Sequence, residues 1–301
     1  MKSKAHRPSG SPFAVHGSRP LIVDSQVHIW GADTPERPWP RPRNGLKPVA
    51  VHQAVPYTHN FLLQEMGKAG VDRVIIVPPS WEGDRNDLAL AAAQQHPDRF
   101  AVMGRLDIEA PDARERIRGW LAQPGMLGLR FALHTPLLEI PLVAGRLDWV
   151  WAEAESAGVP VMVLVRHEHM PLIDRVAERH PGLKLVMDHL GLAGEARDEE
   201  AFRGLDRLLA LGRRPNVAVK ATVLPFFTTD VYPYRSLHPY LKRVYDAFGP
   251  RRIFWGTDLS RLPCTYREGV TMFTEEMPWL SREDLAWIMG RGVCEWLGWR
   301  I

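Results

Sequence analysis

The sequence lacks several features that would each point to a particular class of protein. Only two of its 301 residues are cysteines, Cys264 and Cys294, which argues against a disulfide-stabilised secreted domain and predicts reduced thiols. The 38 Lys and Arg residues are nearly balanced by 35 Asp and Glu residues, and a net charge of +3 is too small for binding nucleic acid by charge alone. No apolar run approaches the roughly 18 residues of a membrane span. We therefore expect no nucleic-acid and no membrane partner.

The beginning of the chain also lacks a targeting signal. Residues 1–20 are basic and rich in Ser, Pro and Gly, without the apolar core of a signal peptide. This composition predicts a flexible N-terminal arm over 1–20, followed by one folded domain over 21–301. Together with the low cysteine content, it predicts a cytoplasmic protein.

What the sequence does contain is an alternation of short apolar runs and longer helical patterns. Amphipathic patterns at 61–70, 146–158 and 198–212 indicate helices, the last with Asp198 as a candidate N-cap. No G-x-G-x-x-G motif follows the first run, which disfavours a dinucleotide-binding sheet. Eight runs have the character of buried strands: 21–28, 71–79, 99–107, 126–133, 159–165, 183–189, 216–222 and 252–258. The pattern predicts an α/β protein built as a single (β/α)8 TIM-type barrel.

Two long irregular segments, 31–56 and 224–239, interrupt this rhythm and predict elaborated βα loops over the barrel mouth. Many of the 26 prolines lie in the first of them, and proline stiffens a loop. Trp30 and Trp39 lie beside or in the loop after strand one, and Trp81 lies in the loop after strand two. We expect their rings to form an apolar wall that suits a flat or cyclic substrate.

The predicted strands end in polar residues, at the face where barrel enzymes carry their chemistry. Gln26 and His28 are two positions apart and therefore face the same side of the first strand. His28, His189 and Asp258 converge on this face, which predicts a metal site or a general-base centre. Arg130 and Lys220 lie on two other strands. Asp188 is interpreted as structural, bonded to a neighbouring backbone group.

Four segments of the sequence carry a family resemblance. They are IVDSQVHIWG from residue 22, HPGLKLVMDHLG from 180, VKAT from 219 and IFWGTDLSRL from 253. In this order they resemble the amidohydrolase superfamily, in its amidohydrolase-2 branch of barrel lactonases and decarboxylases. The resemblance covers nearly all of the chain from about residue 21, and it implies the same barrel fold.

The sequence departs from the metal-dependent members of that branch at two positions. Gln26 stands where they carry the first histidine of His-x-His, and Leu164 stands where a histidine ends strand five. The resemblance therefore leaves His28, His189 and Asp258 as ligands for one weakly held metal at most. This pattern is similar to the metal-independent lactonases, such as 2-pyrone-4,6-dicarboxylate lactonase, in which the aspartate of strand eight is the base.

The resemblance and the strand-end residues together predict hydrolysis of a small carboxylated lactone or related cyclic ester. Asp258 is expected to be the general base, with His28 and His189 polarising the carbonyl and Gln26 adding an amide N–H. Arg130 and Lys220 are candidates for binding a substrate carboxylate. Arg130 pairing with an acid, and a structural role for Lys220, are equally open. No cofactor is expected, and the alternative is one divalent metal, Zn or Mn.

Four loop residues are further candidates for contact with the substrate. Trp81, Arg85 and Asn86 follow strand two, and His167 follows strand five. Asn86 is equally a candidate N-cap for the helix that starts near Asp87.

Two other functions stay open at this point. One is a metal-dependent non-oxidative decarboxylase of an aromatic acid. The other is a catalytically silent subunit that supports an active paralogous barrel. The expected partner is a small anionic or aromatic molecule, and the tryptophans of CEWLGWRI at 294–301 also suggest a homo-oligomer contact.

Overall fold

The computed structural model describes residues 19–40, 50–135 and 138–300, and within them the chain forms one sheet of eight parallel strands in sequential order. The prediction of a single (β/α)8 barrel is confirmed. Every strand is buried along nearly its whole length, as expected for strands covered on both faces. The strands are β1 (Val23–Val27), β2 (Arg73–Ile76), β3 (Phe100–Gly104), β4 (Met126–Leu133), β5 (Val161–Val165), β6 (Leu185–Met187), β7 (Val217–Thr222) and β8 (Ile253–Gly256).

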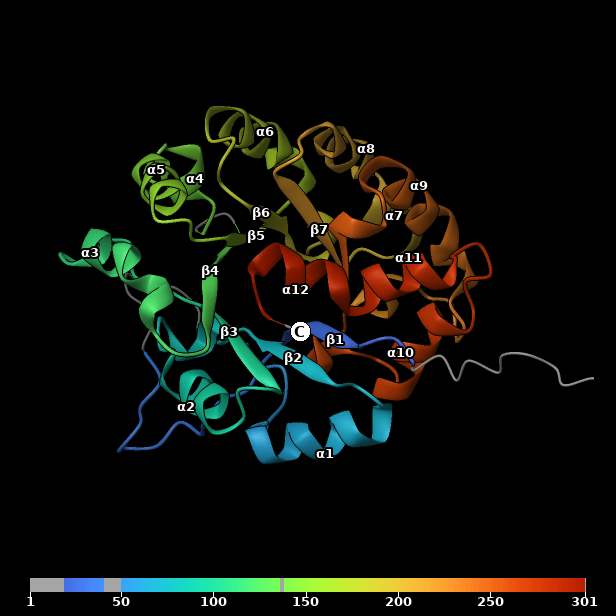
Figure 1. Cartoon of the computed structure of the whole chain (residues 1–301), viewed down its shortest axis with the longest axis horizontal. Coiled ribbons are helices and arrows are strands. Elements are labelled where there is room, and N and C mark those ends of the chain that lie inside the picture. Colours follow the sequence, from blue (N-terminus) through green and yellow to red (C-terminus); the bar gives the residue numbers. More distant parts are fainter. Residues whose placement is uncertain (1–18, 41–49, 136–137, 301) are drawn as a thin grey trace, which may run out of the picture.

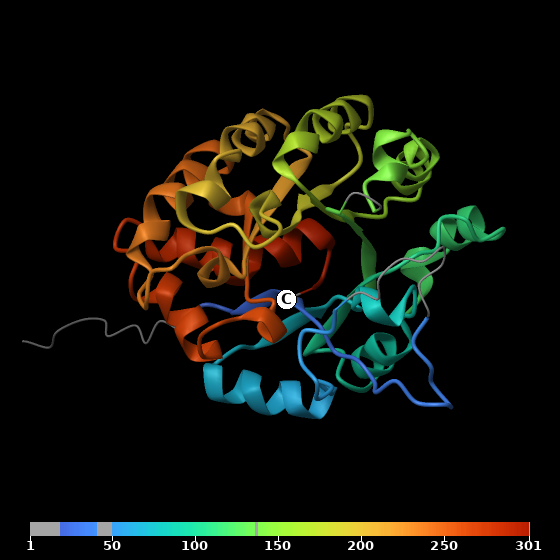
Figure 2. The same ribbon diagram turned by 180° about the vertical axis from the view of Figure 1, so that it is seen from behind.

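The helices lie around the barrel, most of them as an outer ring and the last across one end (Figures 1 and 2). They are α1 (His59–Ala69), α2 (Asp87–Gln95), α3 (Ala113–Arg118), α4 (Ile140–Val143), α5 (Asp148–Ser156), α6 (Met170–Arg179), α7 (Asp198–Phe202), α8 (Leu205–Leu209), α9 (His238–Phe248), α10 (Tyr266–Thr274), α11 (Arg282–Ala286) and α12 (Gly292–Leu297). Their ends follow local chemistry. The hydroxyl of Thr58 caps the start of α1, and Gly70 ends that helix in the left-handed conformation.

The last helix closes one end of the barrel. Val293, Cys294 and Leu297 of α12 pack onto the apolar side chains that fill the barrel interior. Arg73, which begins β2, donates to the carbonyl of Arg300 at 2.6 Å, so α12 lies across the N-terminal ends of the strands. Figure 1 shows α12 across the centre of the ring. With this end sealed, a substrate has to enter at the opposite, C-terminal end.

The barrel is completed by a seam between β8 and β1 that rests on few hydrogen bonds. The N–H of Asp258, just beyond β8, donates to the carbonyl of Gln26 at 2.8 Å. The buried carboxylate of Asp24 accepts from the backbone N–H of Thr257 at 2.9 Å and from that of Gln26 at 3.0 Å. Asp24 therefore holds together the two strand ends that carry the predicted chemistry.

The prediction of one continuous helix over 198–212 is wrong. It divides into α7 and α8 at Gly204, where an added Cβ would lie 2.5 Å from the side chain of His167. Asp198 does begin α7, but its side chain makes no cap. It accepts instead from Thr228 and Thr229 in the loop after β7, at 2.8 and 2.9 Å.

The predicted N-terminal arm over 1–20 lies almost wholly outside the described residues, as does part of the predicted loop over 31–56. Cys264 and Cys294 are both free thiols. Within the described ranges, no helix has the length and apolar character needed to cross a membrane.

Candidate active site

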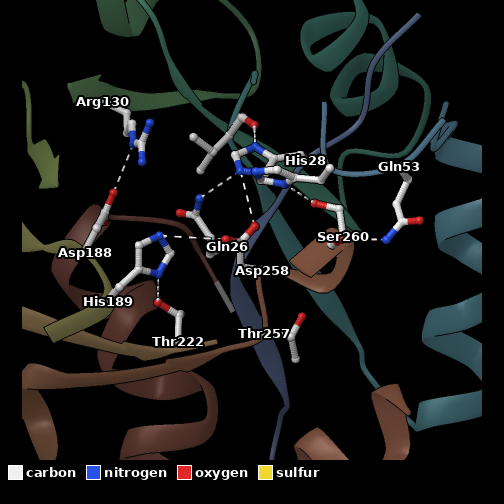
Figure 3. Close-up of polar contacts among 12 residues, drawn as sticks. Gln26, His28, Gln53, Arg130, Asp188, His189, Thr222, Thr257, Asp258 and Ser260 are labelled. Carbon is white, nitrogen blue, oxygen red and sulfur yellow. Dashed lines mark hydrogen bonds and ion pairs between the residues drawn. The ribbon is translucent and has the colours of Figure 1, made fainter. Parts of the chain in front are cut away.

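A cluster of buried polar side chains lies at the C-terminal end of the barrel, at the positions expected from the sequence (Figure 3). Gln26 and His28 come from β1 and the residue after it, and His189 follows β6. Lys220 lies on β7, and Asp258 follows β8. All five are at least 95% buried, so their charges and hydrogen bonds act on one another in a medium of low polarity.

Asp258 is at the centre of this cluster. Its Oδ1 lies 3.3 Å from Nε2 of His28, and its Oδ2 lies 3.9 Å from Nε2 of His189. The residue adopts a left-handed backbone conformation, with φ 51°, which is rare outside glycine and occurs often at functional sites. Burial raises the pKa of the Asp258 carboxyl, although His52 and the cationic residues nearby oppose that effect. A buried carboxylate of raised pKa is a better proton acceptor than an exposed one.

The hydrogen bonds of His28 fix which of its ring nitrogens carries the proton. Nδ1 lies 2.6 Å from the carbonyl oxygen of Val77, which can only accept, so Nδ1 donates. Burial lowers the pKa of His28 to about 3, and the ring is therefore neutral at pH 7. Nε2 then carries a lone pair and faces Asp258.

Gln26 is oriented by the ammonium group of Lys220. Nζ of Lys220 donates to Oε1 of Gln26, which leaves the amide N–H₂ on the other side. That amide nitrogen lies 3.4 Å from Nε2 of His28, at the far end of hydrogen-bond range. The geometry thus directs an N–H toward the histidine lone pair.

Asp188 pairs with two cationic side chains rather than with the neighbouring backbone group that was predicted. Its Oδ1 lies 2.7 Å from Nζ of Lys220, and its Oδ2 accepts from Nε of Arg130 at 3.0 Å. Burial opposes its ionisation, but the two cations outweigh it and hold the pKa of Asp188 below its ordinary value. Arg130 and Lys220 therefore share one buried counter-ion, and an acid does pair with Arg130.

His189 is supported by a hydroxyl group. Its Nδ1 lies 2.6 Å from Oγ1 of Thr222, at the end of β7. Burial holds the pKa of His189 well below 6.5, so this ring is also neutral. When Thr222 donates its hydroxyl proton to Nδ1, the ring proton sits on Nε2 and faces the site.

Sequence reasoning missed His52. This residue lies in the first βα loop, and its ring is 5.5 Å from that of His28 and 4.7 Å from that of Trp81, between centroids. Its Nδ1 pairs with Oγ of Ser260 at 2.8 Å. The signal was a histidine that follows a short apolar run in a proline-rich loop, but without strand periodicity nothing in the sequence indicates that it points to the site.

The loop candidates fall into two groups: one residue lines the cluster, and the others bond to nearby backbone carbonyls. Trp81 is buried, with its ring 5.9 Å from that of His28, so it lines the cluster as predicted. Arg85 donates to the carbonyl of Pro38 at 2.9 Å. His167 pairs with the carbonyl of Leu190 at 2.9 Å. No described contact joins Arg85 or His167 to the cluster.

Asn86 does not serve as the predicted N-cap. It precedes α2, but its side chain makes no cap hydrogen bond. Its Nδ2 donates to the carbonyl of Arg105 at 2.9 Å, and its Oδ1 accepts from the N–H of Arg105 at 2.8 Å. Asn86 therefore ties the loop after β2 to the end of β3.

Three side chains of the site could hold a metal ion. Ligand atoms of His28, His52 and Asp258 all lie within 4.8 Å of one another, whereas the sequence predicted His189 as the second histidine. Two imidazoles and a carboxylate are ligands suited to Zn²⁺. The buried Oδ1 of Asp258 has no hydrogen-bond partner among the described residues and faces the lone pair of His28. This all-acceptor arrangement fits either a shared proton or a cation.

Comparison with known proteins identifies the family of this chain. The family model described as amidohydrolase matches residues 23–291. The chain belongs to the amidohydrolase family. The predicted resemblance is thereby confirmed, together with the prediction of a hydrolase of that family.

Individual relatives are more distant. The chain is 26% identical over 262 residues to an L-fucono-1,5-lactonase of Burkholderia ambifaria, a match that covers 80% of this chain and 81% of that protein. An amidohydrolase of Burkholderia multivorans with bound zinc has a similar fold, with a TM-score of 0.72, 23% identity and coverage of 92% and 99% of the two chains. A candidate 2-pyrone-4,6-dicarboxylic acid hydrolase of Acinetobacter baumannii, solved with citric acid bound, has a TM-score of 0.70 and 16% identity over 92% and 99%.

Proposed function

We propose that this amidohydrolase hydrolyses a small lactone that carries a carboxylate. The observation that carries the proposal is the position of Asp258, a buried carboxylate of raised pKa between two neutral imidazoles at the open end of the barrel. A general base in this setting activates water for attack on an ester carbonyl. The name of the lactonase relative supports the reaction class.

Asp258 supplies both proton transfers of the proposed reaction. It takes a proton from a water molecule as the water oxygen forms a bond to the lactone carbonyl carbon. The ring C–O bond then breaks, and the Asp258 carboxylic acid returns the proton to the leaving alkoxide. The product is an open-chain hydroxy acid, and atoms and charge balance.

The two histidines take different parts in this reaction. Because Nδ1 of His28 donates to Val77, Nε2 can only accept, and His28 is unsuited to the predicted role of polarising a carbonyl. It is instead placed to accept a hydrogen bond from Asp258 after that carboxyl has taken its proton. His189 can present N–H at Nε2 and is the better donor toward the developing oxyanion.

The cationic side chains around the mouth support an anionic substrate. Arg130 uses Nε for Asp188, and its guanidinium is suited to bidentate contact with a carboxylate. Lys220 is committed to Asp188 and Gln26 and lies fully buried, so it contributes charge rather than direct contact. Arg130 and Lys220 therefore have different roles in substrate binding.

A divalent cation, if bound, would be held by His28, His52 and Asp258 and would supply Lewis-acid polarisation of water or of the carbonyl. The positive charges of Arg130, Lys220 and Arg105 lower the pKa of His28, beside the larger effect of burial. The same field disfavours a dication. We therefore expect weak metal affinity, and we expect dialysis against a chelator to change kcat by less than about twofold.

The experiment that tests the proposal is a panel of lactones assayed with the purified protein by acid release at constant pH. It pairs carboxylated five- and six-membered lactones with neutral lactones of the same ring size. We expect hydrolysis of at least one carboxylated member, with kcat/KM at least tenfold above its neutral counterpart. Absence of hydrolysis across the panel would overturn the proposal. Release of CO₂ from aromatic acids that requires added Zn or Mn would favour the decarboxylase instead.

The same panel addresses the silent-subunit alternative. An inert protein that co-purifies with a second barrel protein would favour that reading. The retention of Asp258, His28 and His189 in one buried cluster speaks against it, because each buried polar group costs stability unless it is paired or used.

A further inference from the structure

A second arginine lies beside Arg130 at the open end of the barrel. Arg105 follows the last residue of β3, and the parallel register pairs Gly104 with Leu129 of β4. The next position on each strand is therefore Arg105 beside Arg130. Since residues paired in register project to the same side of a sheet, the two side chains leave the strands in the same direction.

The guanidinium of Arg105 is buried without a hydrogen-bonded counter-ion. Only 13% of its side chain is exposed, and its Nε and one terminal nitrogen have no hydrogen-bond partner among the described residues. The nearest carboxylate, Asp84, is 3.6 Å away, beyond hydrogen-bond distance. Buried polar groups are nearly always hydrogen-bonded, so unpartnered N–H groups on a buried cation call for an explanation.

The backbone of Arg105 is held in place from both sides. The side chain of Asn86 bonds to the N–H and to the carbonyl of Arg105, at 2.8 and 2.9 Å. These two hydrogen bonds fix the backbone of Arg105 and therefore the position of its Cβ. Arg105 is thus preorganised, which reduces the entropy lost when it binds a ligand.

The positive charges of Arg105, Arg130 and Lys220 exceed the negative charges of the carboxylates that pair with them. Arg130 and Lys220 share Asp188, while among the described residues Arg105 forms one ion pair, at 3.6 Å, with the partly exposed Asp84. Burial lowers the pKa of Arg105 to about 10, and the charge of Arg130 adds to that effect. The guanidinium remains charged at pH 7, and its proximity to Arg130 is unfavourable until an anion lies between them.

We propose that Arg105 and Arg130 together form a carboxylate subsite across the β3–β4 seam, and that Arg105 determines specificity for an anionic substrate. The inference rests on the proposed function for the identity of the substrate, but binding at the subsite does not require hydrolysis. The planar guanidinium groups offer N–H donors that match carboxylate oxygens.

The binding test uses succinate as the probe and its uncharged diamide as the control ligand, measured by titration calorimetry. We expect the wild-type protein to bind succinate in the millimolar range or tighter, and to bind the diamide at least tenfold more weakly. Arg105→Gln is expected to weaken succinate binding at least tenfold, and Arg105→Lys to weaken it less. Arg118→Gln, which alters an exposed arginine of α3 that pairs with Glu153, is the matched control and leaves binding unchanged.

Kinetics separate the subsite from the catalytic machinery. With a carboxylated lactone, Arg105→Gln is expected to raise KM at least tenfold while kcat stays within about threefold, and hydrolysis of a neutral lactone stays unchanged. Succinate binding that is absent in the wild-type protein, or equal in the wild-type protein and Arg105→Gln, overturns the subsite, as does equal competition by inorganic phosphate. Succinate binding that depends on Arg105 in a protein without lactonase activity leaves the subsite standing and overturns the proposed function.

Discussion

Nε2 of His28 and Oδ1 of Asp258 lie 3.3 Å apart, and each is an acceptor when the carboxyl is ionised. Two acceptors at this distance repel unless a proton or a cation joins them. The pair therefore gains stability when Asp258 takes a proton, because the new O–H can donate to the histidine lone pair. This relationship acts in the same direction as burial, which raises the pKa of Asp258, and the first two predictions follow from it.

Replacement of Asp258 by Asn should remove the base and keep the fold. The amide has the size of the carboxyl and can donate to Nε2 of His28, but it cannot accept a proton. We expect kcat of Asp258→Asn to fall about 10²- to 10⁴-fold, the range typical of a lost general base. Thermal unfolding serves as the control and should shift by only a few degrees. Unchanged kcat in a folded variant would remove Asp258 from the mechanism.

The pH dependence of the reaction should report the ionisation of Asp258. Burial raises its pKa above the ordinary 3.8, and activity requires the ionised form, so kcat/KM should fall as the pH drops through this raised value. The pKa of His28, at about 3, and that of His52, at about 4, are lowered chiefly by burial. Below the pKa of Asp258 we expect kcat/KM to fall about tenfold per pH unit. A flat profile from pH 7 to pH 4 would contradict the assignment.

The strands were predictable because each buried run lies between clear turn or helix signals, and strand ends are where a barrel collects its polar residues. Gln26, His28, His189, Lys220 and Asp258 were found in this way. His52 and Arg105 were not. His52 reaches the site through a loop without periodicity, and Arg105 follows an apolar strand as an ordinary charged residue would.

The partners of individual side chains were harder to foresee than their positions. Asn86 and Asp198 both stand where a helix begins, and local chemistry predicts that each caps its helix. Both instead bond to segments more than ten residues away in the sequence, at Arg105 and at Thr228. A sequence pattern indicates hydrogen-bond partners that are near in the chain. Whether a side chain bonds to these or to distant partners depends on how the chain packs.

Thr222 is predicted to set the proton position of His189. When its hydroxyl donates to Nδ1, the ring proton is on Nε2, where it can stabilise the oxyanion. Thr222→Val removes this donor with little change in volume and should lower kcat about tenfold, whereas Thr222→Ser should retain most of it. Nitrogen NMR of the histidine ring gives an independent readout of the tautomer. Identical ring spectra in the wild-type protein and Thr222→Val would rule out this positioning role.

Asp24 provides a test of the β8–β1 seam through stability rather than activity. Burial raises its pKa to about 6, against hydrogen bonds from Thr257 and Gln26 that favour the ionised form. Since the folded-state pKa exceeds the unfolded value, the protonated group stabilises the fold at low pH. That contribution is lost as the pH rises through the folded-state pKa.

The difference in unfolding free energy between Asp24→Asn and the wild-type protein isolates this group, because other titrating residues are common to both. Asn cannot ionise, so the variant should gain stability relative to the wild-type protein by about 2 kcal/mol between pH 4.5 and 7.5. Urea unfolding at a series of pH values measures it. Asp246→Asn, at an exposed aspartate of α9, should show a far smaller change over this range. A difference for Asp24→Asn that is constant with pH would mean that Asp24 is already ionised at pH 4.5 in the folded protein, with its hydrogen bonds outweighing its burial.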